Sequence, residues 1–197
     1  EYPYKIMEKI IEYGLMGVWI PKEYGGKGLG VLELCLVVEE LSKACGGVGV
    51  GYAVNALGSF PIMIGGNEEQ KQTYLRDVAT GKKFIAFALS EKESGSGAGS
   101  LKAKAWKDGH GYIIDGDKKW TTNANAAEIY TVFANTNLEK GTRAITAFIV
   151  EKGWEGLTIS KEEDKMVIRC IPVHETHFKN CRVPATNLLG KEGMGFM

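Results

Sequence analysis

The sequence predicts an α+β protein in which an all-helical region, residues 1–82, precedes an antiparallel β domain, residues 83–197. Apolar residues recur at helical spacing up to about residue 80, and from Lys83 the period changes to the two-residue alternation of strands. Short strand-like segments then follow one another, with turn signals and without helices between them. This pattern is typical of an antiparallel barrel or sandwich.

Composition narrows the possible functions. Of the 197 residues, 44% are hydrophobic, which is enough for a core and argues against disorder. The formal net charge is zero, so we expect no electrostatic attraction to nucleic acid or to an anionic membrane surface. The four cysteines include no CxxC pair, which predicts a reduced intracellular protein. Because the sequence does not begin with Met, we expect it to be a piece of a longer chain.

The helical region begins near the start of the sequence. Apolar side chains at helical spacing predict a helix over Tyr4–Tyr13, with Gly14 as its C-cap. The glycine-rich stretch that follows, residues 17–30, fits neither GxGxxG nor GxxxxGK[ST]. A sharp connection between helices is therefore our preferred interpretation of this stretch, and a phosphate-binding loop is the alternative.

Three further helical segments follow. Val31–Ala44 is apolar almost all round, which predicts a largely buried helix. Gly46–Gly66 is long and apolar, but its many glycines fit tightly packed helices of a soluble core better than a membrane span. Asn67 and Gln70 form a predicted capping box, and the helix that they begin should end just before Gly81.

The β domain is predicted from alternation and turn signals. Asp108-Gly109 and Asp115-Gly116 are hairpin signals. The predicted strands are the apolar run that starts at Phe84, followed by Leu101–Trp106, Tyr112–Ile114, Ile129–Ala134, Ala144–Val150, Leu157–Ser160 and His174–Phe178.

The stretch Phe84–Ser100 is the main candidate for a binding site. An apolar strand ends in Ser90-Glu91, and a loop of glycines and serines follows. Such a loop offers unhindered backbone N–H groups and small hydroxyls, which suit a polar, anionic or planar ligand that approaches the main chain closely. We interpret the stretch as the floor of a cofactor site.

A second candidate is Trp120-Thr-Thr-Asn123. If exposed on the sheet, the indole would form a flat apolar plate beside hydroxyl and amide groups, and this set could flank a planar heterocycle. A core tryptophan with strand threonines is the alternative interpretation, and the motif alone favours it.

Other constellations give no catalytic or metal site. Cys170, His174, His177 and Cys181 would share one face of a helix and could bind zinc, but the stretch reads as a strand, on which the two histidines point to opposite faces. We expect edge-strand histidines and unremarkable thiols there. The sequence contains no evident nucleophile–base pair, so we assign no catalytic residue and no metal ligand.

The ordered motifs together resemble the acyl-CoA dehydrogenase family, and the resemblance covers all 197 residues. The stretch Ala88-Leu-Ser-Glu91 with Gly95-Ser96 is similar to the family's A-L-[ST]-E-x-x-x-G-S-D pattern. Further motifs that match are Pro21-Lys-Glu-Tyr-Gly-Gly-Lys-Gly28, Val37–Leu41, Gly65–Leu75, Trp120-Thr-Thr-Asn-Ala124, Lys161–Met166 and Cys181–Gly190. The chain departs from the family patterns in Gly97 for Asp, Thr121 for Ile, and Lys165–Val173, which lacks a glycine and two hydroxyl positions.

The resemblance implies a helical domain, a middle β-barrel and a C-terminal four-helix domain that lies outside this sequence. It also implies FAD against the barrel. Four residues would contact the flavin, mostly through their backbone, with the Ser90 hydroxyl as a hydrogen-bond partner: Phe87, Ala88, Leu89 and Ser90. Gly95 and Ser96 would lie by the flavin and the pantetheine arm of the CoA substrate. Trp120 would sit at the isoalloxazine edge, with the Thr121 main chain nearby and the Thr122 hydroxyl near flavin N5.

The implied reaction is α,β-dehydrogenation of an acyl-CoA thioester in fatty-acid β-oxidation, with electrons passed to an electron-transferring flavoprotein. The family's catalytic glutamate lies in the third domain, so the resemblance implies that this chain alone is inactive. The full-length protein is expected to be a homotetramer or homodimer of the bacterial cytoplasm or the mitochondrial matrix, without a membrane span. The alternatives are a flavin acyl-CoA oxidase and a non-catalytic binding or assembly subunit of the same fold.

Overall fold

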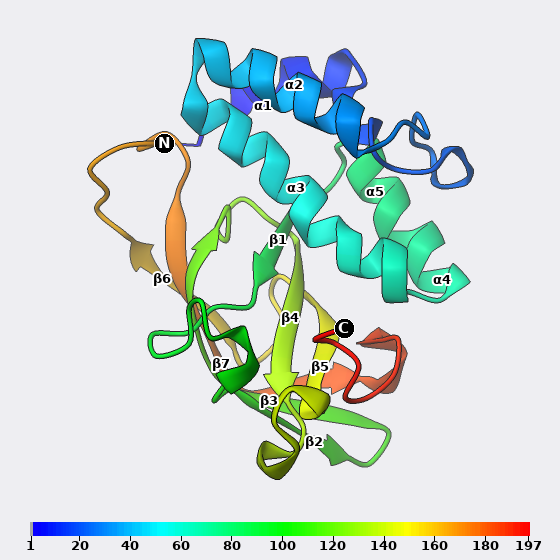
Figure 1. Cartoon of the computed structure of the whole chain (residues 1–197), viewed down its shortest axis with the longest axis vertical. Coiled ribbons are helices and arrows are strands. Elements are labelled where there is room, and N and C mark those ends of the chain that lie inside the picture. The colour runs from blue at the N-terminus through cyan, green and yellow to red at the C-terminus, as the bar shows by residue number, and fades with distance from the viewer. Residues whose placement is uncertain (1) are drawn as a thin grey trace.

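The computed structural model describes residues 2–197 and consists of a helical region set on one end of an eight-stranded sheet (Figure 1). The predicted class, helices followed by a mainly antiparallel β domain, is confirmed. The helices are α1 (Tyr4–Glu12), α2 (Val31–Ala44), α3 (Gly46–Gly65), α4 (Glu68–Gln70) and α5 (Arg76–Ala79). The strands are β1 (Ile85–Ala88), β2 (Lys104–Asp108), β3 (Gly111–Thr122), β4 (Ile129–Asn135), β5 (Ile145–Glu151), β6 (Leu157–Glu162), β7 (Val173–Pro184) and β8 (Leu188–Leu189).

The predicted helix ends and connections are largely confirmed. Gly14 follows α1 with a left-handed φ of 65°, as a C-capping glycine does. Asn67 and Gln70 form the predicted capping box, each side chain bonded at 2.9 Å to the other's backbone N–H. A π-helical segment, Lys71–Leu75, joins α4 to α5. In the glycine-rich connection, backbone N–H groups bond back to the preceding turn, such as Gly28 N–H to the Ile20 carbonyl at 2.9 Å, which favours the connection over a phosphate loop.

The strand order is β6-β7-β3-β2-β4-β5-β8, with β1 paired to β4. The expectation of a wholly antiparallel sheet is wrong, because β1 pairs with β4 in parallel, Ile85 opposite Ile129, and β2 also meets β4 in parallel. The chain between β1 and β4 includes both β2 and β3, and this length allows it to return to the same end of the sheet.

One predicted hairpin is present and the other is not. β2 and β3 pair antiparallel across the turn at Asp108-Gly109, as expected. The prediction of a turn at Asp115-Gly116 is wrong, because β3 continues through this dipeptide to Thr122. The dipeptide forms an irregularity in the pairing with β7, and Gly116 has a φ of 142°. A Cβ at Gly116 would lie 2.6 Å from Ala103 Cα, so the glycine serves close packing within the sheet.

Helix α3 connects the two parts of the fold. The Asn55 amide oxygen accepts from Ile85 N–H at 3.1 Å, and the Thr131 hydroxyl donates to the Gly58 carbonyl at 2.7 Å. By length and composition α3 could cross a membrane, which is weak evidence, and most of it is buried inside this structure. A mostly buried, close-packed core helix over Gly46–Gly65 agrees with the interpretation preferred for this stretch.

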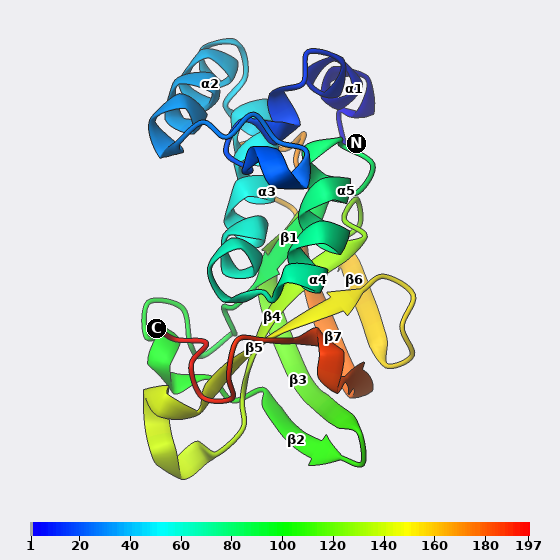
Figure 2. The same cartoon turned by 90° about the vertical axis from the view of Figure 1, so that its right-hand side faces the viewer.

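Helix α2 has the predicted bounds but not the predicted burial. Among its residues only Leu34 is buried, while Val31, Leu32 and Leu36 are more than half exposed. Figure 2 shows the reason, because α2 lies at the far end of the helical region from the sheet and packs on α3 along one side only. The apolar sequence therefore predicted the helix correctly and its environment wrongly.

Buried tyrosines make stability sensitive to alkaline pH. Burial and a hydrogen bond to Glu151 raise the pKa of Tyr74 to about 12, and burial raises the pKa of Tyr52 and Tyr130 further. In the pH range above 10 the folded chain then binds more protons than the unfolded chain, so stability falls as pH rises.

We therefore predict that the free energy of unfolding is unaffected by these tyrosines below pH 10, the model value for their side chain, and declines between pH 10 and 12. Urea unfolding followed by circular dichroism, at a series of alkaline pH values, measures this decline. Tyr74→Phe should make it less steep. A constant free energy across this window would contradict the prediction.

Candidate functional site

The loop that follows β1 is tied to β3 by a buried ion pair. Lys118 Nζ lies 2.6 Å from Glu91 Oε1, and both side chains are almost completely buried. Lys118 Nζ also donates to the Leu89 carbonyl at 3.1 Å. The Glu91 carboxylate accepts further hydrogen bonds from the backbone N–H groups of Lys102, at 2.6 Å, and Ala103, at 3.0 Å. One carboxylate therefore holds both ends of the loop.

Electrostatics at this pair are dominated by burial. Removal of Lys118 from water lowers the pKa of its ammonium group more than Glu91 raises it. The pair is therefore weak evidence for stability in itself, but its geometry fixes where the loop leaves the sheet.

The same connection places Ser90 beside the segment that follows Lys118. The Lys119 N–H donates to the Ser90 carbonyl at 2.9 Å. The pairing of β3 with β7 shifts between Lys118 and Thr121, and Trp120 adopts a left-handed φ of 60° that is rare for a bulky residue. The Trp120 side chain is 53% exposed, so the core-tryptophan alternative is wrong.

Three hydroxyl residues of this region differ in their partners. The Thr121 hydroxyl is buried and lies 3.2 Å from the Thr176 hydroxyl. Ser90 and Thr122 are half-buried, and within residues 2–197 neither hydroxyl has a hydrogen-bond partner. Ser90 is bonded through its backbone to Lys119, the neighbour of Trp120, and Thr122 follows Trp120 by two residues, so two hydroxyls of this region are available to hydrogen-bond a polar ligand.

The glycine-serine loop lies at the rim of this arrangement. The Ser94 hydroxyl donates to the Gly97 carbonyl at 2.6 Å and closes the turn, which leaves Gly95 and Ser96 exposed. Across the part of the chain that the structure describes, no hydrogen bond joins Gly95 or Ser96 to β3. The structure thus brings Phe87–Ser90 together with Trp120–Thr122 and leaves the loop tip in solvent.

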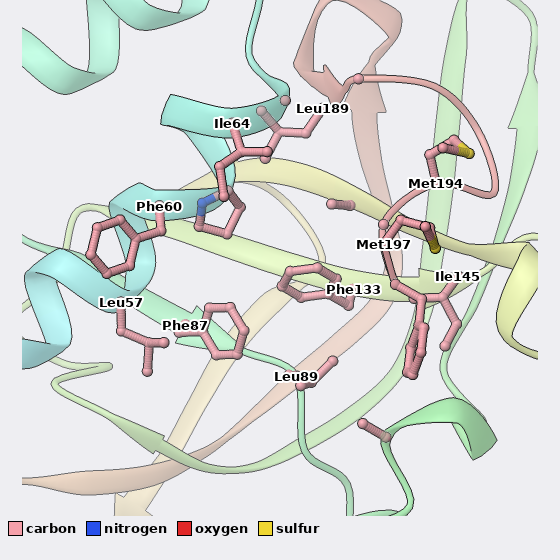
Figure 3. A pocket seen from close by; sticks show the side chains of 17 residues that line it. Leu57, Phe60, Ile64, Phe87, Leu89, Phe133, Ile145, Leu189, Met194 and Met197 are labelled. Carbon is pink, nitrogen blue, oxygen red and sulfur yellow. The ribbon is translucent and has the colours of Figure 1, made fainter. Parts of the chain in front are cut away.

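An apolar cavity of about 560 Å³ opens beside Phe87 and Leu89. Figure 3 shows side chains from α3, β1, β4, β5 and the C-terminal segment turned toward it. Leu57 and Phe60 line the cavity on the side of α3. The ring centroids of Phe133 and Phe87, which also line it, are 5.0 Å apart. The cavity is large enough to bury the apolar part of a small ligand.

The cysteine–histidine segment is not an edge strand, contrary to expectation, because β6 and β3 flank β7 at both histidines. His174 Nδ1 lies 2.9 Å from the Ser160 carbonyl, and His177 Nδ1 lies 2.6 Å from the Asp117 carboxylate. The two side chains thus have different partners on different neighbouring strands. In residues 2–197, no group of three or more His, Cys, Asp or Glu side chains is placed to hold a metal ion.

Sequence reasoning did not identify the paired roles of Glu91 and Lys118. They lie 27 residues apart, in a loop and in a strand. One signal was present in β3, where Lys118 continues the inward alternation of Tyr112 and Ile114. A lysine at an inward position needs a buried partner, and that requirement points to a carboxylate but not to which one.

Both parts of the chain match models of known protein domains. Residues 1–82 match the model of the acyl-CoA dehydrogenase N-terminal domain, and residues 86–181 match that of the acyl-CoA dehydrogenase middle domain. An acyl-CoA dehydrogenase of Bacillus subtilis is 43% identical over 100% of this chain and 52% of its own length. A short-chain specific acyl-CoA dehydrogenase of Clostridium acetobutylicum is 42% identical over 99% of this chain and 52% of its own length. The mitochondrial isovaleryl-CoA dehydrogenase of Pongo abelii is 44% identical over 92% of this chain and 44% of its own length.

Solved structures agree with these relatives. A chain in the structure of the electron transferring flavoprotein of Acidaminococcus fermentans superposes with a TM-score of 0.96 at 43% identity, covering 100% of this chain and 52% of that one. An acyl-CoA dehydrogenase of Bacillus anthracis in complex with FAD superposes with a TM-score of 0.90 at 39% identity, covering 97% of this chain and 33% of that one. This chain spans about half the length of the curated relatives that it matches.

We predict that Lys118→Met destabilises the chain by about 3–5 kcal/mol, because the Glu91 carboxylate loses its buried counter-charge. Urea unfolding at neutral pH measures the change. Adding Glu91→Gln should recover part of the loss, because the neutral side chain needs no buried counter-charge and its one amide oxygen still accepts from one of the two N–H groups, Lys102 or Ala103. Arg182→Met is the matched control, because it breaks an exposed ion pair with Asp108. Equal effects of Lys118→Met and Arg182→Met would show that the buried pair does not hold the loop.

Proposed function

The chain belongs to the acyl-CoA dehydrogenase family, and from this premise we propose that it supplies the helical and β domains of an FAD-dependent acyl-CoA dehydrogenase. We also propose that residues 1–82 and 83–197 are separate domains, in agreement with the ranges of the two family models. The relatives are about twice as long, so the catalytic carboxylate is proposed to lie in the C-terminal half of such a protein.

This proposal rests on two hydroxyl groups without hydrogen-bond partners in the described chain and on an exposed tryptophan side chain in the same region. Ser90 and Thr122 have half-buried hydroxyls without partners in the described chain, and Trp120 presents its indole to solvent. Fixed donors beside a flat ring fit the polar edge and the apolar face of an isoalloxazine. The FAD-bound relative of Bacillus anthracis supports the choice of cofactor.

Each predicted residue then has a role in holding FAD. The backbone of Phe87–Ser90 would line the ring, fixed through the Leu89 carbonyl that accepts from Lys118. The Ser90 and Thr122 hydroxyls would bond ring heteroatoms, and the Trp120 indole would cover the ring edge. Gly95 and Ser96, at the exposed loop tip, would meet the flavin and the pantetheine arm of CoA. When bound, FAD supplies the hydride acceptor for α,β-dehydrogenation of an acyl thioester.

The apolar cavity is proposed to receive the acyl group. Leu89 and Phe87 line it and also belong to the proposed flavin floor, so an acyl chain there would lie beside the cofactor. Leu57 and Phe60 of α3 would then exclude water from the acyl chain. Relatives named for short-chain and isovaleryl substrates support acyl-CoA thioesters as the substrate class.

The exposed Trp120 also suggests how electrons leave the site. We propose an electron-transferring flavoprotein as the acceptor, which the related chain from the Acidaminococcus fermentans structure supports.

The proposed full-length protein is a homotetramer or homodimer of a bacterial cytoplasm or a mitochondrial matrix, in line with its bacterial and mitochondrial relatives. Two alternative functions would give different results when acyl-CoA is added. A flavin acyl-CoA oxidase would release hydrogen peroxide, and a non-catalytic subunit would bind FAD that stays oxidised.

We predict that the purified chain binds FAD, and that Ser90→Ala and Thr122→Val each weaken binding by about 2- to 10-fold, the value of one lost hydrogen bond. Quenching of flavin fluorescence during titration measures the affinity. Thr158→Val is the matched control, because Thr158 is an exposed threonine on β6. Equal weakening by Thr158→Val would assign the effect to the fold, and a folded chain without FAD affinity would contradict the proposal.

We also predict that the FAD-loaded 197-residue chain keeps its oxidised visible spectrum when acyl-CoA is added, because the proposed base lies outside it. A panel of short and branched acyl-CoAs, added anaerobically, tests this. Bleaching by any of them would place a base within these residues and would overturn the division of roles.

A further inference from the structure

Two cysteines far apart in the sequence have adjacent thiols. Cys45 Sγ and Cys170 Sγ are 3.9 Å apart, although 125 residues separate them. Cys45 stands between α2 and α3, and Cys170 lies in the connection between β6 and β7. In Figure 1 this connection reaches up beside the helical region. The expectation of unremarkable thiols in this segment is therefore wrong for Cys170.

A glycine makes the approach possible. A Cβ on Gly47 would lie 2.2 Å from Cys170 Sγ and 3.7 Å from Cys45 Sγ, so any larger residue would displace the Cys170 thiol. The next residue, Ile171, is fully buried, and its Cδ1 would lie 2.5 Å from a Cβ on Gly51. Two small residues of α3 thus allow the connection to dock closely on the helix.

The connection is also held from within. The Arg169 guanidinium donates to the Lys165 carbonyl at 2.7 Å and pairs with Asp164 at 3.0 Å. Ile168 has a left-handed φ of 55°, which is unusual for a β-branched residue and gives the chain a sharp bend before Cys170. These local contacts and the bend at Ile168 lie directly before Cys170 in the chain.

The two thiols have different chemical character. Cys45 is exposed and precedes the 20-residue helix α3. Hydrogen bonds from the backbone N–H groups of Val48 and Gly47 lower the pKa of Cys45, which favours its thiolate. Burial raises the pKa of Cys170 and keeps it as the thiol. This is the arrangement of an accessible nucleophile with a second cysteine in reach.

We propose that Cys45 and Cys170 form an oxidisable dithiol site that closes to a disulfide between the helical region and the β6–β7 connection when the chain meets hydrogen peroxide. The Cys45 thiolate attacks one peroxide oxygen, the O–O bond breaks, and the leaving hydroxide takes a proton to become water. Cys170 sulfur then attacks the resulting sulfenic acid, the S–O bond breaks, and a second water leaves with the Cys170 proton. Two thiols lose two electrons in total, and one peroxide becomes two waters.

Closure requires the two sulfur atoms to approach from 3.9 Å to the roughly 2 Å of a disulfide bond. The cross-link would also brace the segment that carries Trp120. Pro172, two residues after Cys170, accepts from Asn123 N–H at 3.0 Å, and the Asn123 amide donates to the Gly51 carbonyl at 2.9 Å. The disulfide would therefore fix the helix, the connection and the end of β3 to one another.

The test treats the folded chain with hydrogen peroxide and maps its peptides by mass spectrometry without reduction. We expect a Cys45–Cys170 cross-linked peptide, loss of two hydrogens from the intact mass, and a rise in melting temperature of roughly 5–10 °C that dithiothreitol reverses. Cys45→Ser and Cys170→Ser should abolish all three effects, and Cys35→Ser, a matched exposed cysteine on α2, should leave them intact. Serine at position 45 remains a good helix N-cap, so that variant should fold.

Gly47→Ala gives a second, independent test that removes no thiol. Its methyl group must displace the Cys170 thiol, so we expect cross-linking to slow severalfold while the far-ultraviolet circular dichroism is unchanged. Over-oxidation of Cys45 without a cross-link in the unsubstituted chain would overturn the proposal. A cross-link that instead joins Cys35 or Cys181 would also overturn it.

Discussion

The buried ion pair between Glu91 and Lys118 is the constraint on which the candidate site depends. Neither charge can stay in the interior alone, so the loop after β1 must return to the middle of β3. The Glu91 carboxylate also accepts hydrogen bonds from the Lys102 and Ala103 N–H groups, and the Lys118 ammonium donates to the Leu89 carbonyl. Within the proposed flavin floor this network holds Leu89 directly, and Ala88 and Ser90 lie next to it in the chain.

Position and strain are linked at the other side of the site. The same strand that carries the inward Lys118 must expose Trp120 two residues later, which regular alternation does not allow. The shift in pairing with β7 and the left-handed φ of Trp120 resolve this conflict. Backbone strain of this kind persists where the surrounding structure fixes it, and here the buried Lys118 and Thr121 lie on either side. The residue with the strained backbone is therefore also one that we propose to contact the cofactor.

Helix α3 serves several parts of the molecule at once. Asn55 and Gly58 of this helix make hydrogen bonds to β1 and β4. Leu57 and Phe60 line the apolar cavity, and Gly47 leaves room for the Cys170 thiol. The small residues that first suggested close packing are thus distributed over different contacts. A substitution that shifts α3 would therefore affect both the apolar cavity and the dithiol site, because residues of this one helix contribute to both.

The sequence by itself determined the order of helices and strands, the capped helix ends and the family, because these depend on local periodicity and on motifs that are contiguous in the chain. It also identified the two segments, Phe87–Ser90 and Trp120–Thr122, that the structure brings together. Only the tertiary structure decided that α2 is exposed, that β1 pairs in parallel, and that Asp115-Gly116 lies within a strand. It alone decided the pairs Glu91–Lys118 and Cys45–Cys170. Burial and pairing depend on which distant segments meet, and residue spacing carries no record of that choice.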